Sequence, residues 1–161
     1  MKLKYAALYI VLIVAVNYGF SATPLVTLPD GTAWPPISLV VGFVFVARDF
    51  AQREIGHRVL LAMLVGAALS YLMASPMIAV ASAAAFLLSE LVDWAVYSFT
   101  RRPLSQRILY SSALGAPVDS LVFLSGVGIL STAGVAAMTA SKMLGALIVW
   151  WMMRRRETAA G

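Results

Sequence analysis

Six long apolar stretches separated by short breaks constrain this chain more than any other feature of its sequence. A helix rises about 1.5 Å per residue, so about 20 mainly apolar residues are needed to cross a hydrocarbon core roughly 30 Å thick. The stretches have about this length, and the breaks between them are rich in Pro, Gly, Ser or charged residues. We therefore predict helices over residues 3–21, 33–51, 58–74, 77–99, 108–128 and 134–153.

The composition indicates which solvent surrounds these helices. Apolar residues make up 61% of the 161 residues and charged residues only 12%, whereas a soluble domain is about half apolar and about a quarter charged. The chain therefore suits a lipid bilayer, and its length accommodates one domain over residues 1–161. We expect an all-α integral membrane protein with six transmembrane helices.

The first apolar stretch begins like a secretory signal, because Lys2 and Lys4 precede it. It continues to about Phe20, however, which is longer than the roughly 7–15 residues of a signal core. It also carries Asn17 instead of a clean cleavage site. We therefore expect a retained first helix.

Basic residues occur on only one side of an alternating six-helix topology. Eleven of the twelve Lys and Arg residues lie near the two termini or in the second and fourth connections, and the opposite connections contain none. Because Lys and Arg mark the cytoplasmic side, we predict that both termini are cytoplasmic. The exception is Lys142. We interpret Arg48, Asp49, Arg53 and Glu54 as a surface ion-pair network at the cytoplasmic end of the second helix.

This topology divides the chain into two halves of three helices with opposite orientation, as in many transporters. Sequence identity between the halves is not apparent, so an inverted repeat is a hypothesis that rests on topology alone.

Several classes of function receive no support from the sequence. The formal charge of +5 is divided among short clusters at helix ends, which argues against a nucleic acid partner. The chain has no cysteine and a single histidine, His57, which argues against a metal centre and against Cys or Ser–His catalysis. It also lacks the Gly-rich, Lys-containing motif that binds nucleotide phosphates. We therefore expect neither an enzyme nor a resident cofactor.

Four ionisable residues interrupt the apolar helices: Glu90, Asp93, Asp119 and Lys142. Such groups are costly in a bilayer, and they usually face a bundle interior or an aqueous cavity. Asp119 is twelve residues from Arg107, which places it roughly 18 Å from the basic side, near the midplane. Lys142 is also twelve residues from a basic anchor, Arg154, and Asn17 lies at a similar depth. The sequence therefore predicts one polar layer within the bundle.

Helical spacing adds further residues to this layer. Ser82, Phe86, Ser89 and Asp93 follow an i, i+4, i+7, i+11 pattern, so they share one face of a helix. Pro117 removes a helical hydrogen bond close to Asp119, and membrane helices tolerate such a break where it is buried in protein or lines a cavity. The predicted substrate-binding residues are Asp93, Asp119, Lys142, Glu90, Asn17, Ser89 and Phe86.

The charges of the predicted layer do not balance. With its three carboxylates and Lys142 ionised the layer carries a net charge of −2, which a low-dielectric interior disfavours. A proton or a cationic, donor-rich ligand should supply the difference. A simpler interpretation also stays open, in which Lys142 pairs with Asp119 or Asp93 and only holds helices together. Small residues four apart, such as Ser141 and Gly145, are interpreted as helix-packing positions.

Several longer segments form a familiar pattern. They are Asn17-Tyr18, WPPISLVVGFVFVARDFAQREIG over residues 34–56, AVASAAAFLLSELVDWAVYSF over residues 79–99, SSALGAPVDSLVF over residues 111–123, and Ser141-Lys142. In this order they resemble the VUT family of queuosine precursor transporters, six-helix bacterial carriers associated with uptake of 7-deazaguanine bases. The resemblance covers most of the chain, and it implies a multi-pass protein of the bacterial plasma (inner) membrane.

The ligand that this resemblance implies suits the predicted site. A 7-deazaguanine presents its N1–H and amino donors side by side, so one carboxylate can accept both, while Lys142 or Asn17 could donate to its carbonyl oxygen. The flat ring could stack on Phe86. The implied cargo is 7-cyano-7-deazaguanine or 7-aminomethyl-7-deazaguanine, imported by symport down an ion gradient, with protons as one candidate ion.

Two other functions stay open. The chain could be a substrate-binding membrane subunit that needs an ATP-driven partner, since it has no nucleotide-binding motif of its own. It could also be a small membrane assembly protein that transports nothing. The sequence does not decide whether the chain forms a homo-oligomer.

Overall fold

The computed structural model describes residues 3–29, 31–73 and 76–159. In chain order its elements are α1 (Lys4–Ala22), β1 (Val26–Thr27), β2 (Ala33–Trp34), α2 (Ser38–Ile55), η1 (Gly56–Arg58), α3 (Val59–Met73), α4 (Pro76–Phe99), α5 (Leu104–Gly126) and α6 (Thr132–Ala159). Element η1 is a single turn of 3-10 helix. The all-α class expected from the sequence is confirmed.

Four helical segments in the described part of the chain are long and apolar enough to cross a membrane. They are Ser38–Met73, which contains both α2 and α3, then Ala79–Phe99, Leu104–Gly126 and Thr132–Arg156. A shorter apolar helix covers Lys4–Phe20. The chain is therefore a multi-pass membrane protein by helix length and composition.

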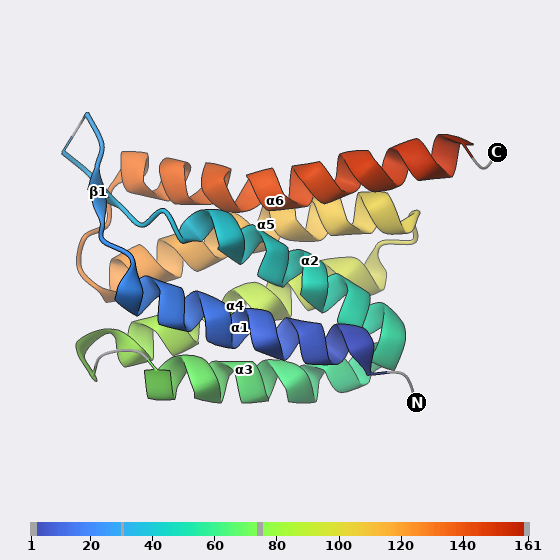
Figure 1. Cartoon of the computed structure of the whole chain (residues 1–161), viewed down its shortest axis with the longest axis horizontal. Coiled ribbons are helices and arrows are strands. Elements are labelled where there is room, and N and C mark those ends of the chain that lie inside the picture. Colours follow the sequence, from blue (N-terminus) through green and yellow to red (C-terminus); the bar gives the residue numbers. More distant parts are fainter. Residues whose placement is uncertain (1–2, 30, 74–75, 160–161) are drawn as a thin grey trace.

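The helices run alternately in opposite directions and lie side by side (Figure 1). The start of α1, element η1, the connection between α4 and α5, and the end of α6 lie together at one end of the bundle (Figure 1). This end is called the basic end, because it includes Lys4, Arg58, Arg101 and Arg154–Arg156. The strands β1 and β2 and the connection between α5 and α6 lie at the opposite end, called the hairpin end (Figure 1).

The second helix differs most from its predicted range of 33–51. It begins at Ser38 and continues to Ile55. Pro35 and Pro36 precede it, and proline disfavours helical backbone in the residue before it, so the chain turns here before the helix starts. Ala33 and Trp34 instead pair with β1 in an antiparallel hairpin. Asp30, in the predicted link over residues 23–32, and the predicted break at Ser75 lie outside the described residues.

Apolar side chains both fill the bundle and cover its outside. Tyr9, Ile13, Val44 and Met63 belong to a buried cluster between α1, α2 and α3. Large apolar side chains such as Val11, Leu61, Leu72 and Leu114 are exposed on the outer surface. An apolar exterior around a partly polar interior is the arrangement that a bilayer favours.

Helices α2 and α6 approach each other closely at a pair of glycines. A Cβ atom added to Gly42 would overlap the main-chain carbonyl of Lys142, and one added to Gly145 would lie 3.0 Å from the carbonyl carbon of Gly42. Small residues let membrane helices pack with their backbones in contact. The packing interpretation of Ser141 and Gly145 agrees with this crossing, which also fixes the position of Lys142.

Candidate functional site

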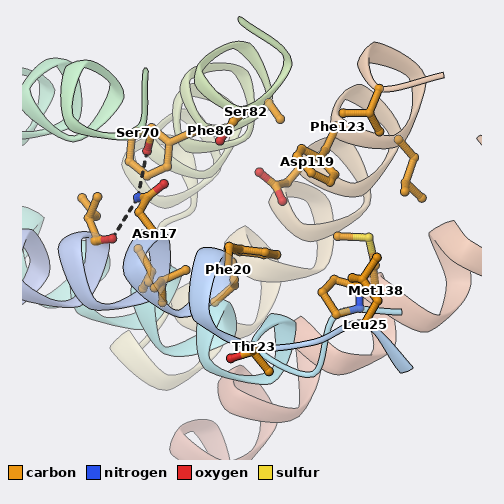
Figure 2. Close-up of a pocket in the computed structure, with 18 of the residues that line it drawn as sticks. Asn17, Phe20, Thr23, Leu25, Ser70, Ser82, Phe86, Asp119, Phe123 and Met138 are labelled. Atoms are coloured by element: carbon orange, nitrogen blue, oxygen red, sulfur yellow. Dashed lines mark hydrogen bonds between the residues drawn. The ribbon is translucent and has the colours of Figure 1, made fainter. Parts of the chain in front are cut away.

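A cavity of about 540 Å³ lies within the bundle and reaches the connections of the hairpin end. Figure 2 shows its polar and aromatic side chains converging from several helices. The lining residues are Ile13, Val16, Asn17, Phe20, Thr23, Leu25, Ala33, Pro35, Val41, Val44, Ser70, Ser82, Ala85, Phe86, Asp119, Phe123, Leu124, Val127, Ile129 and Met138. The volume lies in the range of roughly 300–1,000 Å³ that is usual for small-molecule sites.

Asp119 is the only charged side chain among these lining residues. It extends from α5, and its carboxylate points into the cavity (Figure 2). The Oδ2 atom accepts a hydrogen bond from Lys142 Nζ at 2.5 Å, and Oδ1 accepts one from Ser89 Oγ at 3.3 Å. The side chain of Asp119 is 15% exposed and that of Lys142 only 1%. Asp119 therefore faces the cavity, and Lys142 is buried and forms an ion pair with its carboxylate.

Lys142 makes one further contact that fixes its ammonium group. It donates a hydrogen bond of 2.9 Å to Ser120 Oγ, which in turn donates to the carbonyl of Ala116. Of the two partners considered from the sequence, Asp119 and Asp93, the structure selects Asp119. This ion pair joins α5 to α6 and is locally neutral.

Asn17 lies on the α1 side of the cavity (Figure 2). Its Nδ2 donates to the carbonyl of Ile13 at 2.8 Å and to Ser70 Oγ at 3.2 Å. Ser70 comes from α3, a helix in which the sequence predicted no functional residue. A lone serine in an apolar helix carries no distinctive signal, so only the fold could bring Ser70 to the site.

Three phenylalanines give the cavity flat apolar walls: Phe20, Phe86 and Phe123. The rings of Phe20 and Phe123 lie 6.3 Å apart between centroids and are tilted by 39°. Phe86 was predicted from the polar stripe of its helix. Phe20 and Phe123 were not, because aromatic residues are common in membrane helices and only the packing of α1 against the rest of the bundle brings them together.

A second polar group lies on the basic-end side of the cavity, and it centres on Arg48. The guanidinium is fully buried, and it forms ion pairs with Asp49 at 2.7 Å, with Glu90 at 3.5 Å and with Asp93. Arg48 also donates to Gln52 Oε1 at 2.6 Å. This set of residues (Tyr9, Arg48, Asp49, Gln52, Glu90, Asp93 and Ser111) is called the Arg48 cluster.

The interpretation of Arg48 and Asp49 as a surface ion-pair network is therefore wrong. Both side chains are 0% exposed. Because α2 starts only at Ser38 and ends at Ile55, position 48 falls in the middle of the helix and not at its end. Arg48 joins Lys142 as a basic residue of the bundle interior. The proline pair at positions 35–36 was the signal that could have corrected the depth of Arg48.

Hydrogen bonds from neighbouring helices complete the Arg48 cluster. Tyr9 Oη donates to Glu90 Oε2 at 2.9 Å, and Ser111 Oγ donates to Asp49 Oδ2 at 2.9 Å. On α1, α2 and α4 a cavity-lining residue lies one helical turn from a cluster residue, and on α5 the separation is about two turns, from Ser111 to Asp119. Along α4, for example, Phe86 lines the cavity and Glu90 belongs to the cluster. The cluster therefore lies directly beyond the cavity, toward the basic end.

The predicted site residues thus divide into two adjacent groups. Asp119, Asn17 and Phe86 line the cavity, and Ser89 and Lys142 hold the carboxylate of Asp119. Glu90 and Asp93 do not line the cavity, and both are 0% exposed within the Arg48 cluster. In the part of the chain that the structure describes, no group of three or more His, Cys, Asp or Glu side chains could hold a metal ion.

Comparison with known proteins identifies one family. The model of the family described as "Putative vitamin uptake transporter" matches residues 6–154, which is nearly the whole chain. Searches of curated proteins and of solved structures gave no match.

Proposed function

Because the chain belongs to the vitamin uptake transporter family, we propose that it imports a queuosine precursor through the cavity beside Asp119. The cargo in this proposal is 7-cyano-7-deazaguanine or 7-aminomethyl-7-deazaguanine. The protein then crosses a bacterial plasma membrane six times, with the basic end in the cytoplasm, and an ion gradient drives import. The distribution of Lys and Arg supports this orientation.

The observation that carries the proposal is the single carboxylate in an aromatic cavity. A 7-deazaguanine offers two adjacent N–H donors, and a carboxylate can accept both in a fork geometry. Phe20, Phe86 and Phe123 offer faces for a flat ring. Guanine offers the same pair of donors, so it belongs among the ligands to be tested.

Asn17 and Lys142 have different roles in this proposal. Asn17 lines the cavity, but both of its N–H groups already donate, to Ile13 and Ser70, so it meets the carbonyl oxygen of the base only by exchanging the longer bond to Ser70. Lys142 is 1% exposed and lies behind Asp119, so it balances the charge of the carboxylate without touching the base. Ser89 has one hydroxyl hydrogen for two acceptors, the carbonyl of Phe86 at 3.0 Å and Asp119 Oδ1 at 3.3 Å, so its support of the second carboxylate oxygen is weaker than that of Lys142.

Ligand-dependent thermal stabilisation of the purified protein in detergent tests the proposal. A ligand that binds only the folded state raises the apparent stability of the protein. We expect both 7-deazaguanines to raise the melting temperature, guanine to do so less, and biotin and riboflavin not at all. If either vitamin raises the melting temperature and the 7-deazaguanines do not, that vitamin is the cargo and the proposed cargo is wrong.

The variant Asp119→Asn should abolish this stabilisation, because an amide cannot accept both donors of the base. Glu54→Gln is the matched control. It makes the same carboxylate-to-amide change at the basic end, where Glu54 accepts hydrogen bonds from the main-chain N–H groups of Lys4, Tyr5 and Ala6. The control should bind the ligand as the unmodified protein does.

A further inference from the structure

The Arg48 cluster carries more negative than positive charge and is sealed from solvent. Its charged groups are one guanidinium and three carboxyl groups, those of Asp49, Glu90 and Asp93, and all four side chains are 0% exposed. The Asp119–Lys142 pair is balanced by itself. If every group is ionised, the whole excess of negative charge in the bundle interior therefore lies in this cluster.

Four carboxyl oxygens of the cluster have no hydrogen-bond donor among the described residues. Asp49 Oδ1 and Asp93 Oδ2 are at least in ion pairs with Arg48. Glu90 Oε1 and Asp93 Oδ1 have neither a hydrogen bond nor an ion pair. Buried polar atoms are nearly always hydrogen-bonded, and an ionised carboxylate that lacks donors is especially unfavourable. Glu90 and Asp93 are three residues apart on α4, a spacing at which side chains on one helix face meet. A proton on one of these oxygens would turn it into a donor for the other.

Among the described residues, these carboxyl groups form ion pairs with Arg48 alone. The described titratable and charged side chains that face Glu90 and Asp93 are Tyr9 from α1, and Arg48 and Asp49 from α2. Two guanidinium groups lie over the ring of Tyr97 on α4. The Cζ atom of Arg48 is 5.8 Å from the ring centroid, and that of Arg107 on α5 is 5.3 Å from it. The hydroxyl of Ser111 adds a neutral donor. A bound metal ion is disfavoured by the adjacent guanidinium.

We propose that the Arg48 cluster is a proton-binding site, separate from the substrate cavity, in which Glu90 and Asp93 share one proton. The coupling of this proton to import rests on the proposed transport function, whereas the binding of the proton does not. Its place between the cavity and the basic end means that loading or loss of the proton changes the ion pairs that close the bundle on that side. Transport and proton movement would then be linked through Arg48.

Infrared spectroscopy of the purified full-length protein tests the proton directly. A protonated buried carboxyl group absorbs at a higher carbonyl stretching frequency than a carboxylate, and the band shifts in D2O. We expect such a band at neutral pH in the unmodified protein. Glu90→Gln or Asp93→Asn should remove it, whereas Asp119→Asn and Glu54→Gln should leave it in place.

Tyr9→Phe provides a second variant that keeps every carboxyl group. It removes the 2.9 Å hydrogen bond to Glu90 Oε2 and should shift the band without removing it. An unmodified protein without the band overturns the proposal, and so does a band that none of the Glu90, Asp93 and Tyr9 variants alters. Failure of every 7-deazaguanine to bind would overturn the proposed cargo and leave this spectroscopic result unaffected.

Discussion

Gly42 lies against the main-chain carbonyl of Lys142, so closely that a Cβ atom at position 42 would overlap it. This contact sets the depth of Lys142 in the bundle, and the 2.5 Å hydrogen bond from Lys142 then orients Asp119 at the cavity. A backbone crossing of α2 and α6 therefore supports a side chain on α5. The cavity depends on positions that do not line it.

The variant Gly42→Val should destabilise the bundle, because the new side chain meets backbone atoms that have no rotamer through which to move away. Overpacking a tight contact typically costs about 1–3 kcal/mol. The melting temperature in detergent measures the effect. Ala68→Val is the control, since it adds similar bulk at an exposed position of α3. Equal melting temperatures for both variants would contradict the close crossing.

The Lys142–Asp119 pair should respond differently to single and double replacement. Lys142→Met alone leaves an unpaired carboxylate near the middle of the bundle, and breaking a buried pair in this way costs about 3–5 kcal/mol. Adding Asp119→Asn removes that charge and should restore much of the melting temperature. The double variant should still fail to bind a 7-deazaguanine, because the acceptor for its paired donors is gone. Full binding by the double variant would reduce this pair to a purely structural role.

Glu54 should stabilise the first helix through its contacts with the start of α1. Its carboxylate accepts three main-chain hydrogen bonds of 2.9–3.2 Å and lies at the positive end of the helix dipole. Glu54→Ala should therefore cost about 0.5–2 kcal/mol, as the loss of a capping side chain does. Glu54→Gln keeps an acceptor oxygen and should cost less. A melting temperature unchanged by Glu54→Ala would show that this cap contributes nothing measurable.

The orientation of the chain predicts a fixed pattern for reporter fusions. Fusions after Gly31 and Gly128 should report the outside of the cell, and fusions after Gly56 and Arg102 the cytoplasm. The first pair belongs to the β1–β2 and α5–α6 connections, which lie at the hairpin end (Figure 1). The second pair belongs to η1 and the α4–α5 connection, which lie at the basic end. A C-terminal fusion that reports the outside would contradict the assignment of the basic end to the cytoplasm.

The sequence predicted the helices and part of the site for a simple physical reason: buried charge in an apolar helix is rare enough to identify. Asp119, Lys142, Glu90 and Asp93 were identified in this way, and the neutral Asn17 was added because it lies at a similar depth. Arg48 was missed because a basic residue near a predicted helix end looks like a membrane-surface anchor. Four residues of helix beyond the predicted end place it in the interior instead.

Partition of the predicted residues between two groups could not be read from the sequence. Ser89 and Glu90 are adjacent in the chain, yet Ser89 donates to Asp119 at the cavity while Glu90 pairs with Arg48. Helix rotation and the neighbouring helices decide such a division. The positions of Arg48 on α2 and Lys142 on α6 depend likewise on the two glycines at the α2–α6 crossing, since a single methyl group there would change the spacing of both helices.

Uptake by liposomes that contain only the purified chain tests the central proposal most directly. Labelled 7-cyano-7-deazaguanine and 7-aminomethyl-7-deazaguanine should accumulate in these liposomes under an inward proton gradient, above the level in empty liposomes, and Asp119→Asn should reduce uptake to that level. Equal uptake by Asp119→Asn, or no accumulation of either base by the unmodified protein under the gradient, would contradict the account.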